Sequence, residues 1–357
     1  MGKIKVIFLV PYPLKEAPSQ RFRFEQYFDV LEKNQIDYRV SSFIDEKTWK
    51  ILYKPGYYFQ KTLGILLGFL RRKWVLLSIP FYDFVFIHRE ASPIGLPFLE
   101  FFISKIFRKR IIYDFDDAIW LENTSDTNKI AGSFKCHWKV KYICSWAYKV
   151  SCGNAYLADY AKQFNTNVVI NPTTIDTEHL HNRSIDYKNG KSVIGWTGTH
   201  STIGYLDAIV PILRELEEEL EFAFIVISNR APLFELKSLQ FIPWNKETEI
   251  EDLLKMNIGI MPLEDDIWAK GKCGFKGLQY MSLGIATIMS PVGVNVEIIQ
   301  ERVNGLLAST REEWKDCLRE LIIDIPLRNK LGAEGQKTIE ARYSVKSNRQ
   351  RFLELFR

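Results

Sequence analysis

Residues 258–290 read IGIMPLEDDIWAKGKCGFKGLQYMSLGIATIMS and contain a strand, a polar loop, a helix and a second strand in that order. The first strand is Ile258–Met261, and the loop after it is rich in Gly and Lys. A helical pattern follows from about Phe275 to Leu283, and Ala286–Ser290 is again strand-like. Two strands connected through a helix form a βαβ unit, which places them parallel in one sheet. This stretch therefore predicts an α/β fold.

The same alternation of short apolar strands and longer helical patterns runs through the rest of the chain. In the first half we expect strands at Ile4–Val10, Tyr38–Phe43, Phe84–His88, Arg110–Tyr113, Lys149–Cys152 and Val168–Ile170, with helices at Arg21–Lys33, Pro97–Phe107 and Ala155–Gln163. The second half restarts with strands at Ser192–Trp196, Phe222–Ile227 and Leu239–Ile242 and a helix at Tyr205–Leu220. Alternation of this kind is typical of parallel sheets covered by helices on both faces.

The polar, turn-rich segment Asn171–Asn189 lacks helical periodicity and is the expected linker. We predict two doubly wound, Rossmann-like domains facing a central cleft, residues 1–178 and 179–342. Residues 1–178 carry 25 Lys and Arg against 18 Asp and Glu, a net charge of +7. Residues 179–357 carry 23 against 25, a net charge of −2. The basic excess therefore belongs to the first half.

The composition narrows the class of protein. The chain has 357 residues, 46% hydrophobic and 25% charged, with a net charge of +5. These values are ordinary for globular proteins and argue against disordered, collagen-like and coiled-coil classes. The weak charge argues against a nucleic-acid partner. Five cysteines without a C-x-x-C pair indicate free thiols in a reducing compartment, and we expect a cytoplasmic protein without a secretory leader.

The first half also contains a candidate membrane surface. The run Leu63–Leu70 is strongly apolar but far shorter than the ~20 residues that cross a bilayer. It ends at Arg71, Arg72 and Lys73, and a second basic cluster lies at 105–110. Such clusters beside apolar helices suit peripheral binding to an anionic membrane on the inner face of the plasma membrane. Alternatively, they are ordinary basic helix C-termini.

Two features of the second half predict a phosphate-binding site. The turn in IGWTGTHSTIGYL (194–206) supplies Gly198, Thr199, Ser201 and Thr202 between a strand and a helix. Helix N-termini of this kind attract anions. In the quoted stretch, Lys272 and Lys276 add full positive charges near a helix start, and Gln279 lies on the same helix face as Lys276. The alternative is a solvated lysine pair with a buried Gln.

Polar residues gather where strands of the first half should end. IIYDFDDAIW (111–120) places Asp114, Asp116 and Asp117 at a strand end, and His88 ends FVFIH. Ligands of open α/β sheets bind at the carboxyl ends of the strands, so Asp116 and His88 are candidate catalytic residues. Magnesium binding is a rival role for the acids, helix capping for Asp117 and a structural role for His88.

The first strand is followed by VPYPLKEAPSQRFRF, which lacks the G-x-G-x-x-G turn of dinucleotide-binding proteins. The missing turn argues against an NAD-dependent dehydrogenase. Arg21 and Arg23 could form an anion site at a helix start, or they could be solvated arginines on a capped helix.

Together these motifs resemble the retaining GT-B glycosyltransferases of family 4. The specific part is Met261–Leu306, where FKGLQYMSLGIATIMSPVGVNVEII is similar to the family's donor-site pattern and Asn304–Gly305–Leu306 to its Asn-Gly-Phe-Leu signature. The turn IGWTGTHST and the acidic DFDDAIW resemble corresponding segments of one branch of the family. The segment after about residue 343 resembles the last helix of that fold, which crosses back onto the first domain, so 343–357 is assigned to it.

The resemblance implies roles for particular residues. The first domain would bind the acceptor and the second the nucleotide-sugar donor, with Phe275 and Gln279 in the donor site. Lys276, Lys272 and the turn 198–202 would stabilise the leaving diphosphate, and Asp116 would face the sugar. The acceptor or a phosphate could also contact Arg21, Arg23, Asp114 or Asp117. No metal and no cofactor are expected.

The sequence also departs from that family. Its paired glutamates are replaced by Gly271 and Gln279, and the usual Arg and Lys after the first strand of the second domain are missing. The expected function is transfer of a sugar from a nucleoside-diphosphate sugar to a lipid-linked or saccharide acceptor, in bacterial surface polysaccharide or glycolipid synthesis. Two alternatives are a sugar-nucleotide epimerase of the same fold and a catalytically degenerate binding subunit.

Overall fold

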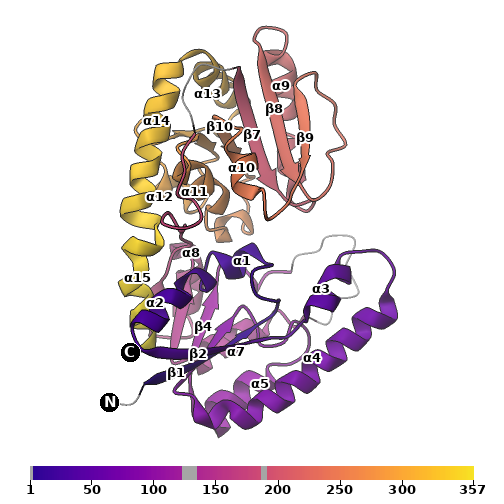
Figure 1. Cartoon of the computed structure of the whole chain (residues 1–357), viewed down its shortest axis with the longest axis vertical. Coiled ribbons are helices and arrows are strands. Elements are labelled where there is room, and N and C mark those ends of the chain that lie inside the picture. Colours follow the sequence, from indigo (N-terminus) through magenta and orange to yellow (C-terminus); the bar gives the residue numbers. More distant parts are fainter. Residues whose placement is uncertain (1–2, 123–134, 186–190) are drawn as a thin grey trace. The chain divides into compact units, whose positions relative to one another are not determined.

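The computed structural model describes residues 3–122, 135–185 and 191–357, so part of the expected linker (186–189) lies outside the described residues. The chain divides into two compact units (Figure 1). Unit 1 comprises Met1–Thr173 together with Arg349–Arg357, and unit 2 comprises Thr174–Asn348.

Unit 1 is built on a parallel six-stranded sheet of order β2-β1-β3-β4-β5-β6. The strands are β1 Ile4–Val10, β2 Ile36–Ser42, β3 Phe84–His88, β4 Arg110–Phe115, β5 Lys149–Cys152 and β6 Val168–Ile170. The helices are α1 Pro18–Arg21, α2 Phe28–Lys33, α3 Glu46–Leu52, α4 Tyr58–Ser78, α5 Phe98–Phe101, α7 Lys139–Trp146 and α8 Ala155–Lys162. Every residue of β3 is buried, as expected for a central parallel strand.

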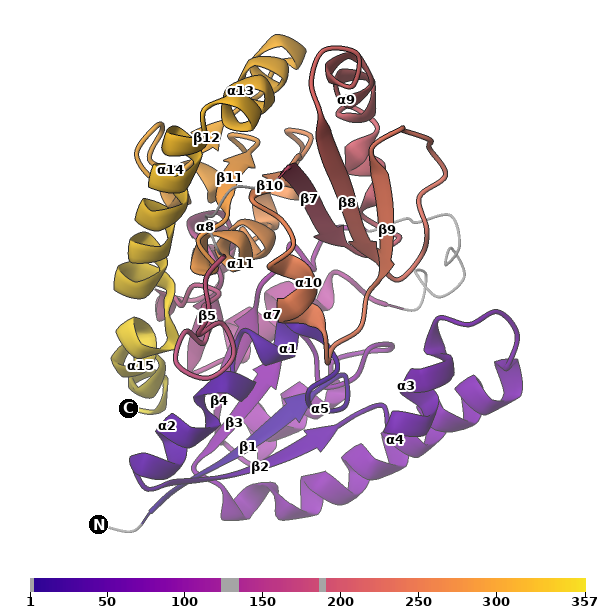
Figure 2. The same ribbon diagram turned by 45° about the horizontal axis from the view of Figure 1, so that its top comes forward.

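Unit 2 repeats this architecture with the order β12-β11-β10-β7-β8-β9. Its strands are β7 Ser192–Gly198, β8 Phe222–Ser228, β9 Leu239–Pro243, β10 Ile258–Met261, β11 Ala286–Met289 and β12 Leu306–Leu307. Its helices are α9 Val210–Leu216, α10 Glu249–Leu253, α11 Phe275–Ser282, α12 Asn295–Ile298, α13 Arg311–Ile323 and α14 Ile325–Thr338, and α15 Val345–Leu353 leads back into unit 1. Figure 2 shows this second sheet with its covering helices.

Alternate residues of β8 enter two different cores. Phe224 and Val226 pack with residues of α9, α13 and α14, whereas Ile225 and Ile227 pack with Tyr280 and residues of α10. Because side chains of a strand alternate between the two faces of a sheet, both faces of this sheet are covered by helices. The predicted α/β class with doubly wound parallel sheets is confirmed.

Three predicted helices are broken in the structure. The segment Arg21–Lys33 forms α1, a 3-10 turn at Glu25–Tyr27 and α2. The expected helix Pro97–Phe107 is α5 followed by a π-helix at Phe102–Ile106. The expected helix Tyr205–Leu220 is a 3-10 turn, Ile203–Leu206, and then α9, because a proline lies in the first turn of α9. Proline fits a helix start but has no N–H for an earlier turn to use.

Candidate functional site

The predicted phosphate turn of unit 2 is a compact hydrogen-bonded loop after β7. The Thr199 N–H donates to the Thr202 hydroxyl at 3.2 Å, and the hydroxyls of Thr199 and Ser201 are 2.8 Å apart. The His200 N–H donates to Oδ1 of Asn229 at 2.8 Å. These bonds fix the loop, and it continues into a short 3-10 helix instead of a long α-helix.

Gly198 has a packing role that the sequence did not reveal. A Cβ atom at this position would lie 2.4 Å from the Trp196 ring, so the indole fills the space that a side chain would need. Trp196 itself is buried in the core of unit 2. The glycine therefore makes room for Trp196.

Both predicted lysines lie over aromatic rings near the end of β7. The Lys276 Nζ is 5.5 Å from the centre of the Trp196 ring, and the Lys272 Nζ is 5.8 Å from that of Tyr205. Cations at these distances are attracted to the negative face of the ring. Trp196 belongs to β7 and Tyr205 to the 3-10 turn, so the structure brings both ammonium groups to the carboxyl end of β7.

Helix α11 begins immediately beside these lysines. Gly274 precedes it with φ of +68°, in the left-handed region, and a Cβ there would lie 2.3 Å from Cδ1 of Ile298. Phe275 and Lys276 are then the first two residues of the helix. Helix N-terminal N–H groups carry a partial positive charge, so the lysine charges and the helix dipole have the same sign at this point.

Two side chains of α11 connect it to the same region. The Tyr280 hydroxyl accepts a hydrogen bond from the Thr197 N–H at 2.9 Å, which ties the helix to the end of β7. Burial raises the pKa of Tyr280, so the hydroxyl stays protonated. Gln279 is buried, and its Nε2 has no hydrogen-bond partner among the described residues. A buried donor without a partner costs about 1–3 kcal/mol, so this amide is suited to a ligand oxygen.

In unit 1 the predicted Asp114 is the centre of a buried network. It pairs with Arg23, accepts a hydrogen bond from the Ser151 hydroxyl at 2.7 Å, and its Oδ2 is 2.8 Å from Nδ1 of His88. Burial alone would raise the pKa of Asp114, but Arg23 and His88 outweigh it and hold the pKa well below its usual range. Asp114 is therefore ionised, and Arg23 also donates to the carbonyl oxygen of Asn171.

The structure thus places three predicted residues away from solvent. Arg23, His88 and Asp114 are enclosed in unit 1, and the anion that Arg23 binds is a carboxylate of the chain itself. His88 pairs in register with Asp114 and contacts that residue instead of Asp116. The Nε2 of His88 is buried without a hydrogen-bond partner among the described residues. Arg21, half-buried, lies over the ring of Phe22 with its guanidinium carbon at 5.0 Å.

Asp116 and Asp117 are both held by Arg89, which the sequence analysis missed. The Arg89 Nε donates to Oδ1 of Asp116 at 2.8 Å, and its NH2 group lies 2.9 Å from Oδ2 of Asp117. Burial would lower the pKa of Arg89, but the two carboxylates raise it, so the guanidinium remains charged. Arg89 follows β3 directly with φ of +57°, a conformation rare outside glycine. Its position after the apolar run FVFIH was the available signal.

The three acids therefore form two separate ion-pair groups, Asp114 with Arg23 and Asp116 with Asp117 on Arg89. Asp116 keeps a 12% exposed side chain. Within the described residues, no group of three or more His, Cys, Asp or Glu side chains is arranged to hold a metal ion. All five cysteines are free thiols. In the same ranges, no helix combines the length and apolar character needed to cross a membrane.

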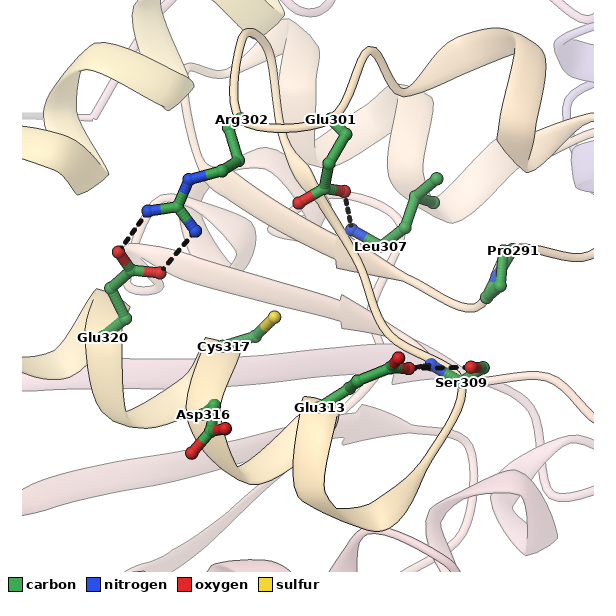
Figure 3. A pocket seen from close by; sticks show the side chains of 9 residues that line it. All are labelled: Pro291, Glu301, Arg302, Leu307, Ser309, Glu313, Asp316, Cys317 and Glu320. Atoms are coloured by element: carbon green, nitrogen blue, oxygen red, sulfur yellow. Dashed lines mark hydrogen bonds and ion pairs between the residues drawn. The ribbon is translucent and has the colours of Figure 1, made fainter.

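A separate hollow of unit 2, of about 490 Å³, is shown in Figure 3. Its lining includes four acids, Glu301, Glu313, Asp316 and Glu320. Three of these acids are already bonded. Glu313 caps α13, Glu301 accepts the Leu307 N–H at 2.7 Å, and Glu320 pairs with Arg302. This arrangement stabilises local structure and contains none of the predicted site residues.

Solved structures match the whole chain. Sucrose-phosphate synthase from Thermosynechococcus elongatus is similar with a TM-score of 0.70 at 9% identity, covering 99% of this chain and 98% of that one. HepE from Anabaena, in complex with UDP and glucose, gives 0.65 at 13% identity with 98% coverage of both chains. The fold is GT-B. The catalytic domain of starch synthase IV from Arabidopsis thaliana, bound to ADP and acarbose, gives 0.67 at 10% identity and covers 100% of this chain and 99% of that one.

Comparison of the sequence finds no relative, although comparison of the structure finds many similar folds. No protein-family model and no curated protein matches the chain. At 9–13% identity the likeness to these GT-B structures establishes the fold. Function has to be argued from the residues of the site.

Proposed function

We propose that this GT-B protein is a retaining glycosyltransferase, similar to family 4, that transfers a sugar from a nucleoside-diphosphate sugar to an acceptor hydroxyl. The observation that carries the proposal is the arrangement in unit 2, where Lys272 and Lys276 meet the carboxyl end of β7 beside the start of α11. Two ammonium groups and a helix N-terminus suit a diphosphate. UDP and ADP are the nucleotides bound by the HepE and starch synthase structures described above.

The chemistry assigns a task to each residue. The diphosphate gains negative charge as the bond to the sugar breaks, and Lys276 and Lys272 stabilise that charge electrostatically. The buried amide of Gln279 supplies a hydrogen bond to a ribose hydroxyl. The Thr199 and Ser201 hydroxyls of the turn 198–202 share one hydrogen bond, so one of their two protons remains for the diphosphate, and Phe275 lies at the first position of the helix.

In unit 1, Asp116 is the proposed carboxylate for the sugar, which becomes oxocarbenium-like in the transition state. The ion pair with Arg89 orients Asp116, and Asp114 with Arg23 and His88 supports the strand end from which these residues project. The acceptor is a saccharide or a lipid-linked molecule, the context is bacterial surface polysaccharide synthesis, and no metal takes part in the proposed step. The expected compartment is the cytoplasm.

Replacing the central lysine tests the proposal. Lys276→Ala is expected to lower kcat/KM for sugar transfer on the order of 10²–10³-fold, the usual loss for one transition-state donor. Lys276→Arg, which keeps the charge, should recover part of the rate. Lys237→Ala is the matched control, because Lys237 is an exposed lysine of the same unit paired with Glu218. Unaltered transfer by Lys276→Ala in a folded protein would remove Lys276 from the mechanism.

The donor and the class of reaction are identified by a separate measurement. Thermal unfolding of the full chain is followed with a panel of nucleotide sugars, and the stabilising donor is then incubated with and without saccharide acceptors. We expect stabilisation by one donor and product only with acceptor. An isomerised donor formed without acceptor would instead indicate an epimerase, and stabilisation by none of the panel would indicate a degenerate binding subunit.

A further inference from the structure

Helix α4 buries its small residues and exposes its large ones. Its buried positions are Gly64, Gly68, Arg72 and Val75. A Cβ at Gly64 would lie 2.2 Å from the Thr48 hydroxyl, and one at Gly68 would lie 2.8 Å from the carbonyl oxygen of Phe43. The two glycines therefore let the α4 backbone approach α3 and the end of β2 closely. Figure 1 shows α4 along the lower edge of unit 1.

The opposite side of α4 is apolar and faces solvent. We call it the α4 face, defined by Phe59, Leu63, Leu66, Leu70, Trp74 and Leu77, all of which are exposed. Phe59 is 78% exposed and Trp74 72%. Burying a large apolar side chain is favourable by about 1.5–3 kcal/mol relative to leaving it in water. A continuous apolar surface of this kind marks an interaction site in a soluble protein.

The apolar surface continues onto the neighbouring segments. Phe81, just after α4, is 76% exposed. The Lys109 Nζ donates to the carbonyl oxygen of Pro80 at 2.7 Å, which places the end of the π-helix segment beside the end of α4. That segment adds the exposed side chains of Phe102 and Ile106.

The segment that contains the α4 face carries charges of one sign, although Asp45, just before it, pairs with Arg71 of α4 at 3.6 Å. Between Glu46 and Asp83 the sequence contains seven Lys and Arg and no Asp or Glu. The structure corrects the predicted basic cluster, because Arg72 is buried and donates to the carbonyl oxygens of Ala91, Ser41 and Val10. Arg71 donates to backbone carbonyls and is half-buried.

The outward positive charges are accordingly fewer than the sequence indicated. Lys73 points outward among the exposed apolar residues, and Lys105 and Arg108 are exposed on the adjoining segment. Each is separated from the next by apolar side chains, so the surface combines a broad apolar contact with isolated cations. This pattern is typical of helices that lie in the headgroup region of a membrane.

We infer that the α4 face docks unit 1 onto an anionic phospholipid bilayer. Leu, Phe and Trp side chains would enter the headgroup and acyl boundary, while Lys73, Lys105 and Arg108 contact lipid phosphates. A second copy of the chain fits less well, because a self-pairing contact brings Lys73 onto a surface whose 47–82 segment has no acid to neutralise it. At ~1.5 Å per residue, the 21 residues of α4 give a contact about 31 Å long. The inference is independent of the proposed sugar transfer.

Vesicle binding by the full chain tests this docking. The protein is mixed with vesicles of phosphatidylcholine alone or with 30% phosphatidylglycerol, and bound protein is separated by flotation. We expect binding to the anionic vesicles that falls at high salt. Leu66→Gln/Leu70→Gln should lower the partition coefficient at least tenfold, and Lys73→Gln about fivefold on anionic vesicles only, since one cation near such a surface contributes a modest free energy.

Matched controls make the result decisive. Leu233→Gln replaces a 92% exposed leucine of unit 2 and should leave vesicle binding unchanged. Because all the substituted side chains are exposed, thermal unfolding should match the parent protein. The inference is overturned if the parent protein fails to bind anionic vesicles, or if Leu66→Gln/Leu70→Gln binds like the parent. It is also overturned if the lipid-free protein is a dimer that this double variant dissociates.

Discussion

At the scale of residues, the Asp114 network shows how the interior of unit 1 accommodates charged side chains by pairing them. Arg23 and Asp114 are 91 positions apart in the sequence, yet both are fully enclosed and paired. A buried ion pair of this kind is expensive to break, because the remaining charge has no partner and no water. The pair therefore fixes the segment after β1 onto the end of β4.

Asp114→Asn should destabilise unit 1 by about 3–5 kcal/mol at neutral pH, because Arg23 loses its buried counter-charge. Amide hydrogen exchange of peptides covering β3 and β4 in the full chain measures the loss. Asp159→Asn, at an exposed pair with Lys162, is the control and should change protection by less than about 0.5 kcal/mol. Equal protection in Asp114→Asn would show that the pair contributes little.

The effect of Asp114→Asn on stability should depend on pH. The folded-state pKa of Asp114 is lower than its unfolded value, so its stabilisation is fully present above the unfolded value of ~3.9. It is lost progressively as the pH falls from there through the folded-state pKa. The stability difference between the parent protein and Asp114→Asn should therefore narrow below about pH 4, and a constant difference would contradict the assignment.

The sequence could place Asp114 and His88 at adjacent strand ends, because apolar strands and their polar ends are local patterns. It could not show that Arg23 would close on Asp114, since that contact is set by the packing of distant segments. Arg89 was missed for a related reason. Its position after the apolar run FVFIH places it at the sheet edge, but the left-handed backbone conformation on which its role depends cannot be predicted from that pattern.

At the scale of elements, α11 and α4 differ in how far the sequence could describe them. The start and end of α11 are marked by Gly274 and Gly284, and the helix was predicted to within one residue. Helix α4 was seen only as an apolar run. Its inward positions are Gly64, Gly68 and Arg72, the reverse of the usual amphipathic pattern, so periodicity could not say which side faces the protein.

Gly274→Ala tests the helix start on which the proposed donor site depends. An alanine at this position would have to adopt φ of +68° and would place its Cβ 2.3 Å from Ile298. We expect this strain to lower the free energy of unfolding by about 1–3 kcal/mol and to displace Lys276. Thermal unfolding and the KM for the donor measure both effects. Gly204→Ala is the matched control. A Cβ at Gly204 would lie 3.9 Å from the nearest atom, Oδ2 of Asp207, and the backbone there is not left-handed. A Gly274→Ala protein with normal stability and donor KM would show that the turn adapts freely.

At the scale of the whole molecule, the chain returns to unit 1 after completing unit 2. Residues Arg349–Arg357 belong to unit 1, where the ring of Phe352 stacks on Tyr27 with centroids 4.2 Å apart. Phe356 lies against Phe84 and Phe86 of β3. The core of unit 1 therefore includes residues that follow the whole of unit 2 in the sequence.

Phe352→Ala tests this dependence, because Phe352 is fully buried and its removal should destabilise unit 1 by about 3–5 kcal/mol. Hydrogen exchange should accelerate in β1 and β3, while β7 and β8 keep their protection, since Phe352 belongs to the core of unit 1. Arg349→Ala, an exposed neighbour on the same segment, should change neither unit. Equal loss of protection in both units would mean that they unfold as one cooperative body, and the C-terminal segment would then stabilise the whole chain.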